Sequence, residues 1–174
     1  MAKSKKHPYQ ALLEDTMAAW LWEDEVEYNE DGNFYHISTL YTVDKTSGYR
    51  MFLEAYVSSG LIKFYLYSPM LIPEKRYKDA CVVLNRLNKN IYCGALDLSG
   101  ESVRYIQTVD VEGFAPEVQL ISNIRNAAGN AFRPKIVEAL GVLAFTKLSV
   151  EDIIAQYEAP EENGDDDGDL PEEL

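Results

Sequence analysis

Hydrophobic positions along the chain change their spacing, and each spacing predicts a different kind of element. Over residues 8–22 the apolar side chains recur every three or four positions, which is typical of an amphipathic helix. Pro8 suits the first turn of this helix, because a missing N–H loses no hydrogen bond there. The spacing then falls to two residues, which is typical of β-strands with one buried face. Three segments show this alternation: 33–43, 49–57 and 61–67.

Short connections between these segments predict a three-stranded antiparallel meander. Residues 44–48 and 58–60 contain turn-forming residues and are too short for a crossover, so consecutive strands must be antiparallel neighbours. Val26–Tyr28 adds a short leading arm to the first strand. The acids Glu23–Glu25 end the preceding helix, since they lie at the negative end of its dipole.

The second half of the chain continues with a helix, two strands and further helices. In order, these are a helix beginning at Pro73, strands over 91–98 and 102–111, a helix that follows Pro116 and is broken at Pro134, its continuation over 135–146, and a short helix after the capping-box sequence Ser149–Asp152. The order is therefore α-βββ-α-ββ-α-α. Because runs of strands are separated by helices, we predict an α+β fold with an antiparallel sheet of about five strands, in a single domain over residues 1–157.

Charge is concentrated at one end of the chain. The 174 residues include 29 Asp and Glu against 16 Lys and Arg, a net charge of −13, and 47% are hydrophobic, which is enough for a sizeable core. Nine of the acids lie in residues 158–174, where there is no Lys or Arg, so residues 1–157 carry a net charge of only −4. Residues 158–174 contain few apolar side chains and cannot repay the entropy of ordering. We predict a disordered acidic tail there.

The composition also favours one cellular environment and excludes some partners. No run of 18 apolar residues could span a membrane, and no apolar segment of the kind found in signal peptides follows the N-terminal lysines. Two cysteines, Cys81 and Cys93, are too few for a disulfide framework. The acidic chain repels nucleic acid and anionic lipid. We therefore expect a cytoplasmic protein with reduced thiols and with neither nucleic-acid nor membrane partners.

Residues that could carry chemistry do not form any known motif. His7 and His36 have no second His or Cys at ligand spacing, and neither a phosphate-binding glycine motif nor a nucleophile elbow occurs. We therefore assign no catalytic, cofactor-binding or metal-binding residues. Cys81 falls on the apolar stripe of its helix, which predicts a buried structural thiol. Glu54, in the middle of a strand, is expected to form a cross-strand ion pair with Lys63 rather than to act as a general base.

The acidic tail contains one pattern that resembles a calcium loop. Residues 163–170 place oxygen ligands at suitable positions, but position 12 is Leu174, which has no carboxylate, so the pattern is a coincidence of composition. An alternative is that residues 165–174 form a linear docking motif, with Leu170 and Leu174 as apolar anchors among acids.

Tyrosine is abundant, with 12 in the chain, and many fall on predicted strands. Tyr65 and Tyr67 beside Lys63 resemble an aromatic platform for nucleic acid, but the net charge is negative and the RNA-binding sequence signature is absent. Tyrosine provides large contact area at small entropic cost, which makes it common at protein interfaces. Two interpretations stay open: these tyrosines only cover the sheet, or Tyr56, Tyr65 and Tyr67 bind a protein partner.

Several short sequences, in the same order, resemble one family of bacterial proteins, the YbjN family, whose members are labelled sensory transduction regulators. The similarity extends over about residues 8–157 and does not include the tail. It is carried by Ser68-Pro69-Met70-Leu71-Ile72-Pro73-Glu74-Lys75-Arg76, Leu84–Asn88, Gly94–Leu98, Val103–Tyr105 and Leu148–Ile154.

The resemblance implies a fold like that of type III secretion chaperones, which are small α+β domains that usually dimerise and hold partner polypeptides. It implies no catalytic residues. Our leading hypothesis is a non-enzymatic, chaperone-like interaction or regulatory domain, a homodimer without cofactors, that binds a partner polypeptide through helix and sheet surfaces. The alternative is a small-molecule-sensing or enzymatic domain with a pocket between the sheet and the C-terminal helices.

Overall fold

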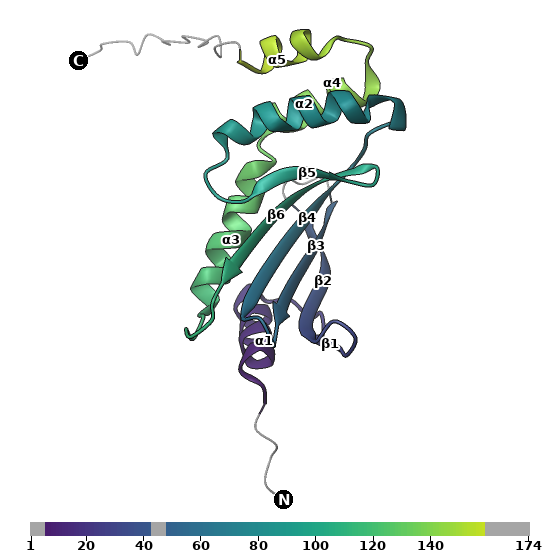
Figure 1. Cartoon of the computed structure of the whole chain (residues 1–174). Coiled ribbons are helices and arrows are strands. Elements are labelled where there is room, and N and C mark those ends of the chain that lie inside the picture. The colour runs from purple at the N-terminus through teal and green to yellow at the C-terminus, as the bar shows by residue number, and fades with distance from the viewer. Residues whose placement is uncertain (1–5, 43–47, 159–174) are drawn as a thin grey trace, which may run out of the picture.

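The computed structural model describes residues 6–42 and 48–158, which form one antiparallel sheet with helices against one of its faces (Figure 1). Within these residues the sheet has six strands in the spatial order β1-β2-β3-β4-β6-β5. They are β1 (Glu27–Asn29), β2 (Phe34–Thr42), β3 (Gly48–Tyr56), β4 (Leu61–Leu71), β5 (Ala95–Ser99) and β6 (Ser102–Asp110). The predicted α+β class and antiparallel sheet are confirmed.

The first strand differs from the prediction. The leading arm at residues 26–28 is not an extension of β2 but a separate strand, β1, which pairs antiparallel with β2. The chain can reverse between them because Asn33 adopts a left-handed conformation, with φ of 53°, and the Asn29 side chain accepts the N–H of Gly32 at 2.7 Å. The sheet therefore has six strands rather than about five.

The fifth strand is shorter than predicted. Residues 91–93 are not extended into the sheet, and β5 begins only at Ala95. Gly94 has a φ of +70°, a left-handed conformation that interrupts a strand. The apolar residues before it therefore lie in a loop, although their composition is strand-like.

The helices of the described residues cover one face of the sheet. This layer consists of α1 (Pro8–Trp20), which contacts β2, α3 (Val118–Ala131), which contacts β4 and β6, and α4 (Pro134–Phe145), which contacts β4. The helix α2 (Tyr77–Leu87) lies between the short 3-10 helices η1 (Glu74–Arg76) and η2 (Asn88–Asn90) and packs on β5. It also contacts α4 and α5 (Val150–Glu158), so these three helices form a group at one end of the sheet (Figure 1).

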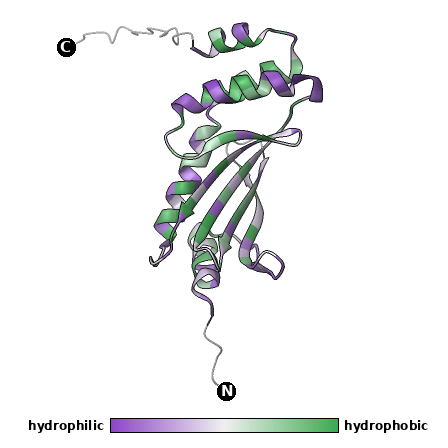
Figure 2. Ribbon diagram, viewed as in Figure 1, coloured by the Kyte–Doolittle hydropathy of each residue, from purple (hydrophilic) through white to green (hydrophobic). Residues whose placement is uncertain are grey.

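Alternation in the sequence decides which side chains enter the core (Figure 2). Every second residue of the central strands is fully buried beneath the helices, and burial of such side chains stabilises the fold by about 1.5–3 kcal/mol each. In β3 and β4 these residues are Tyr49, Met51, Leu53, Ala55, Ile62, Phe64 and Leu66. The helices contribute Leu13, Ile121, Ile124, Leu140 and Leu143, among others.

Helix boundaries follow the expected local chemistry, with one exception. Pro134 separates α3 from α4 as predicted, and it is itself the first residue of α4, one position before the expected start at residue 135. Ser149 caps α5 by accepting the N–H of Asp152 at 3.1 Å. The first helix ends at Trp20, earlier than predicted. There Leu21 takes a left-handed conformation, with φ of 57°, so the backbone rather than the following acids ends the helix.

The prediction that Cys81 is buried is wrong, since this cysteine is free and exposed. The buried residues of α2 are Ala80, Val83, Leu84 and Leu87. The buried face is centred on Ala80, Leu84 and Leu87, which were predicted correctly. At 3.6 residues per turn Cys81 lies about 100° from Ala80 around the helix, beyond the edge of this face, whereas Val83 lies only about 60° from Ala80 on the other side. Cys93 is likewise free and exposed.

Some predictions concern residues outside the described ranges. The calcium-like pattern, the docking motif and the disorder expected for the tail, apart from its first residue Glu158, fall within residues 159–174, and the first strand was expected to extend to residue 43. These stay predictions. Glu158, by contrast, is the last residue of α5.

Candidate functional site

One face of the sheet is not covered by any helix of the described residues, and we call it the open face (Figure 1). Its side chains come from the positions that alternate with the core. They are His36, Ser38 and Leu40 of β2, Arg50, Phe52, Glu54 and Tyr56 of β3, Lys63, Tyr65 and Tyr67 of β4, Arg104 and Ile106 of β6, and Asp97 of β5. The face is thus rich in aromatic residues, most of them only half-buried.

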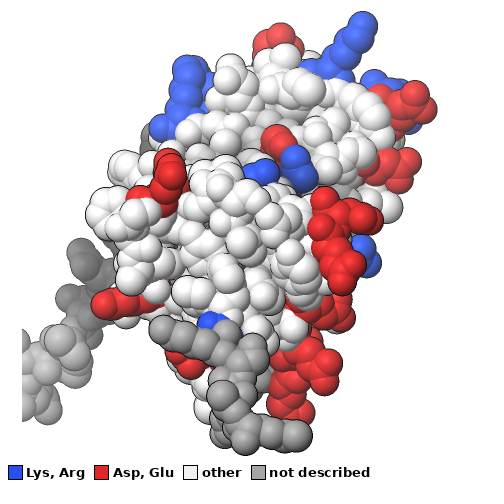
Figure 3. Space-filling view, turned by 60° about the horizontal axis from the view of Figure 1, so that its bottom comes forward, with Lys and Arg blue, Asp and Glu red and all other residues white. Residues whose placement is uncertain are grey.

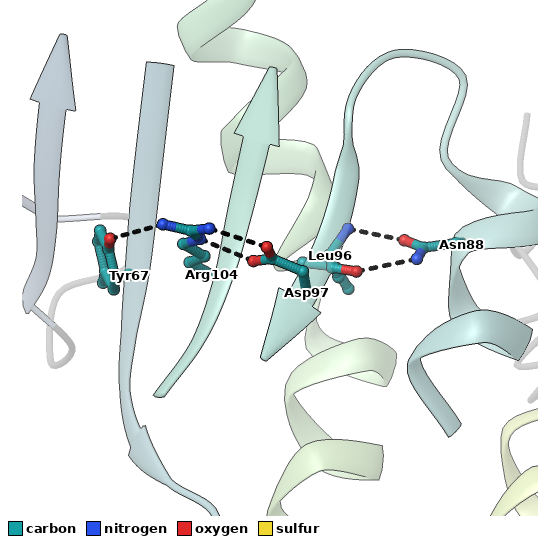
Figure 4. A network of polar contacts seen from close by, with 5 residues as sticks. All are labelled: Tyr67, Asn88, Leu96, Asp97 and Arg104. Carbon is teal, nitrogen blue, oxygen red and sulfur yellow. Dashed lines mark hydrogen bonds and ion pairs between the residues drawn. The ribbon is translucent and has the colours of Figure 1, made fainter. Parts of the chain in front are cut away.

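Strand register brings Tyr67, Arg104 and Asp97 side by side across three strands (Figure 4). The Arg104 guanidinium donates to both carboxylate oxygens of Asp97, at 2.8 and 2.9 Å, and to the hydroxyl of Tyr67 at 3.0 Å. It also lies 5.2 Å from the ring centroid of Tyr65. Hydrogen bonding to Asp97 raises the pKa of Arg104, so the guanidinium stays charged and holds these side chains in fixed positions.

Glu54 and Lys63 are directly opposite each other on β3 and β4, but the expected ion pair is replaced by contacts of each side chain with Tyr56. Glu54 accepts a hydrogen bond from the hydroxyl of Tyr56 at 2.8 Å, while the Lys63 ammonium lies 4.5 Å from the centroid of the Tyr56 ring. Burial, followed by this hydrogen bond, raises the pKa of Tyr56. The tyrosine ring therefore takes the place of a direct contact between the two charges.

We expect the stability of the protein to fall at alkaline pH, partly because the Tyr65 hydroxyl ionises at a higher pH in the folded chain than in the unfolded chain. Burial, with a contribution from Glu54, raises the pKa of Tyr65 from its ordinary value of 10.0 to about 12. Because the folded pKa is the higher one, the contribution of Tyr65 to stability is complete below pH 10 and is lost as the pH rises through about 12.

Denaturant unfolding at several pH values in this window measures the effect. The free energy of unfolding should fall more steeply with pH in the wild type than in Tyr65→Phe, which has no ionisable hydroxyl. Because both proteins contain the other tyrosines, the difference between their slopes of unfolding free energy against pH reports on Tyr65 alone. Equal slopes in the two proteins would contradict the burial of Tyr65.

The two edges of the sheet differ in accessibility. At the β5 edge, the Asn88 side chain accepts the N–H of Leu96 at 2.7 Å and donates to its C=O at 2.9 Å, as a neighbouring strand would (Figure 4). At the other edge, β1 pairs with β2 only as far as His36. In an antiparallel pair only every second residue forms backbone hydrogen bonds with the neighbouring strand, and in β2 the odd-numbered residues do so with β3. The N–H and C=O groups of Ser38 and Leu40 therefore point away from β3, to a side where no described strand lies.

A hollow of about 480 Å³ lies on the open face near this free edge. Leu40 and Leu71 line it and are 73% and 54% exposed, unusually high values for leucine. Phe52, Tyr67 and Arg50 also line the hollow. A hollow whose lining combines exposed leucines with polar groups and one cation, Arg50, is suited to receive a side chain from another polypeptide.

A second cavity, of about 350 Å³, matches the pocket of our alternative hypothesis in part. It lies between the loop before β5, which contributes Ile91, and the junction of α3 and α4, which contributes Ala131, Arg133 and Ile136. The lining comes from the C-terminal helices as expected, but from a loop rather than from the strands of the sheet.

The described residues contain no group of three or more His, Cys, Asp or Glu side chains that could hold a metal ion. In the same part of the chain, no helix combines the length and apolarity of a membrane span. The face shown in Figure 3 has a broad area of uncharged side chains, with acidic side chains gathered along one side of it.

The structure places all three predicted partner-binding tyrosines, Tyr56, Tyr65 and Tyr67, on the open face. Sequence reasoning missed Arg104 and Asp97, which connect two of them. A signal was present: the tight turn between β5 and β6 makes Asp97 and Arg104 cross-strand partners in an antiparallel hairpin.

Comparison with known proteins gives one family and two similar structures. The chain matches the YbjN family, described as "Putative bacterial sensory transduction regulator", over residues 11–133. A chain of the HopA1-SchA chaperone-effector complex is 14% identical, with a TM-score of 0.47 over 79% of this chain and 93% of that chain. YbjN of E. coli, described as "a putative transcription regulator", is 9% identical, with a TM-score of 0.47 over 76% of this chain and 91% of that chain. No curated protein matches the sequence.

Proposed function

The chain belongs to the YbjN family, and on this premise we propose that it is a non-enzymatic regulatory domain of the cytoplasm that binds a partner polypeptide across the open face. The observation that carries this proposal is the helix-free, aromatic face itself. A sheet face that no helix of the described residues covers, yet that carries half-buried Tyr56, Tyr65 and Tyr67, has the composition of a protein interface.

The arrangement of polar groups supports recognition rather than chemistry. Arg104 is engaged by Asp97 and Tyr67, and Glu54 is engaged by Tyr56. Such mutual hydrogen bonds fix the side chains before a partner arrives, which reduces the entropy lost on binding. No two of these groups are left free to act together as an acid and a base.

The free edge of β2 favours a polypeptide as the partner. An extended segment could hydrogen-bond to the outward-facing backbone of Ser38 and Leu40, while one of its apolar side chains enters the hollow beside Leu71. Small molecules do not need a backbone edge of this kind.

Quantitative co-purification from the native host tests the proposal. The tagged full chain is compared with a variant carrying Tyr56→Ala, Tyr65→Ala and Tyr67→Ala, and with Tyr92→Ala as the matched control, because Tyr92 is fully exposed and outside the open face. We expect at least one specific partner to fall about tenfold or more with the triple variant, since loss of interface aromatics of this kind costs about 2 kcal/mol or more.

The same partner should be retained by Tyr92→Ala. If every specific partner is retained equally by the triple variant, the open face is not the binding surface and the proposal fails. Unfolding of the triple variant is measured in parallel, so that a loss of binding is interpreted only for folded protein.

The cavity of about 350 Å³ supports a second candidate, a small-molecule sensor. A ligand that binds only the folded protein raises its melting temperature by mass action, so a thermal-shift screen of metabolites and nucleotides distinguishes the two candidates. A reproducible shift that is abolished by Ile136→Trp, which fills the cavity, would favour the sensor.

The homodimer expected from the family resemblance is also a proposal. The apolar stripes on the helices that motivated it pack within one chain, as Leu84 and Ile124 show. A dimer would therefore have to use other surfaces, and light scattering that gives the mass of a monomer would exclude it.

A further inference from the structure

A groove begins where the described part of the chain ends. Glu158, the last residue of α5, lines a cavity of about 500 Å³ together with Asn90, Arg133 and Lys135. Asn90 and Arg133 also line the cavity of about 350 Å³, so the two cavities adjoin and form one groove. The groove runs from the end of α5, past the start of α4, to the loop before β5.

The two halves of this groove differ in chemistry. The half near Glu158 carries the cations Arg133 and Lys135, and its one carboxylate, Glu158, is already paired with Arg86 on α2. The other half is mainly apolar and contains no acid. Its apolar lining residues are Ile91, Ala127, Ala131 and Ile136.

Residues 159–174 have the complementary chemistry in the complementary order. They contain eight acids, no Lys or Arg, and two leucines, Leu170 and Leu174. Four of the acids lie in residues 165–169, immediately before Leu170. A segment that binds this groove needs carboxylates for Arg133 and Lys135, followed by an apolar side chain for the hollow beyond them, and residues 165–170 provide both.

We propose that the acidic tail docks in this groove of its own chain, with the carboxylates of residues 165–169 at Arg133 and Lys135 and with Leu170 in the apolar half. The tail is attached to the wall of the groove, because Glu158 lines it. Leu170 is twelve positions after Glu158 in the sequence, enough for about 40 Å of extended chain, so the tail can reach the apolar half with slack.

Because the tail is covalently attached beside the groove, weak contacts are sufficient to hold it there. A short flexible linker gives an effective concentration in the millimolar range, so a segment with a dissociation constant of about 1 mM is bound for a large part of the time. The charge contacts are exposed and are therefore screened by salt, which makes the docking reversible. The docking does not depend on the proposed function, and it gives the cavity of the small-molecule hypothesis a different occupant.

Amide NMR spectra of the full chain test this directly. We compare the wild type with Leu170→Ser and with Leu174→Ser as the matched control. Both substitutions lie outside residues 6–42 and 48–158, which contain the described core, so they leave the core residues unchanged. At low salt, the amide resonances of Ile91, Ala127 and Ile136 should shift in Leu170→Ser and stay unchanged in Leu174→Ser.

Salt and a groove variant provide the second measurement. Raising NaCl from about 0.05 to about 0.5 M shortens the Debye length from about 14 to about 4 Å, so the wild-type resonances should move to the positions seen in Leu170→Ser. Arg133→Gln should shift the resonances of residues 165–170 in the same direction, whereas Lys147→Gln, on the exposed loop before α5, should not.

The proposal is overturned if the groove resonances of wild type and Leu170→Ser coincide at low salt. It is overturned too if the resonances of residues 165–170 do not shift in Arg133→Gln. It is also overturned if the shifts disappear on dilution of the protein, because the tail would then bind another copy. None of these results bears on the open face, so failure here and failure of the proposed function are distinguishable.

Discussion

Phe64→Ala is expected to destabilise the protein by about 3–5 kcal/mol, the range found when a buried phenylalanine is truncated and leaves a cavity. Phe64 lies in the central strand β4, has no exposed surface, and faces the layer of α3 and α4. Its strand neighbours are also fixed by pairing, so the space it leaves cannot close. Thermal unfolding should show a loss of about 6–20 °C in melting temperature for a domain of this size.

The adjacent residue provides the control. Tyr65→Ala removes a side chain of similar size from the open face, where the ring is partly solvated and no helix rests on it. We expect a loss of only about 1 kcal/mol, as for most substitutions outside a core. Equal losses for the two variants would mean that both faces of the sheet are covered in solution, and the open face would have to be abandoned as a free surface.

Gly94→Ala is expected to cost about 3 kcal/mol, from two separate causes. A left-handed backbone, with φ of +70°, costs any residue with a Cβ about 1–2 kcal/mol. The Cβ would also lie 2.5 Å from the ring of Tyr105 and 2.6 Å from the carbonyl oxygen of Ile106. Neither neighbour can move freely, because Tyr105 is fully buried and Ile106 is paired within the sheet, so overpacking adds about 1–3 kcal/mol.

Gly100→Ala separates these causes. Gly100 also has a positive φ, of +61°, but nothing lies within 4 Å of the position its Cβ would take. Urea unfolding should therefore show a loss of only about 1 kcal/mol for Gly100→Ala. If Gly94→Ala costs no more than Gly100→Ala, the close approach of the loop to Tyr105 is wrong.

The Gly94 result also bears on the groove, since the loop that Gly94 ends contributes Ile91 to the apolar half. The hydroxyl of Tyr105 lies 2.8 Å from the carbonyl oxygen of Cys93 and 2.6 Å from Oε1 of Gln107. The loop is thus held by a core tyrosine, and a variant that displaces this tyrosine should change the groove as well as the stability.

Local sequence pattern determined the elements of this protein and their burial. Period-two alternation located β2, β3, β4 and β6 and chose the buried residues of each strand, because a strand has only two faces. Proline and serine located the starts of α4 and α5, because their effects on the backbone act within a few residues. The pattern could not settle the loop at residues 91–93, since it depends on the conformation of Gly94 and on contact with Tyr105.

Only the tertiary structure decided which side chains are exposed and where grooves form on the surface. Sequence placed Tyr56, Tyr65 and Tyr67 on strands, but only the arrangement of the helices left their face of the sheet open. It also left Cys81 exposed, although Ala80 and Leu84 of the same predicted stripe are buried, because the width of the buried face and the side to which it extends depend on the neighbouring elements. The groove at Arg133 joins the consecutive helices α4 and α5 to the loop before β5, which lies far from them in the chain. Such contacts are set by the packing of the whole domain rather than by any local pattern.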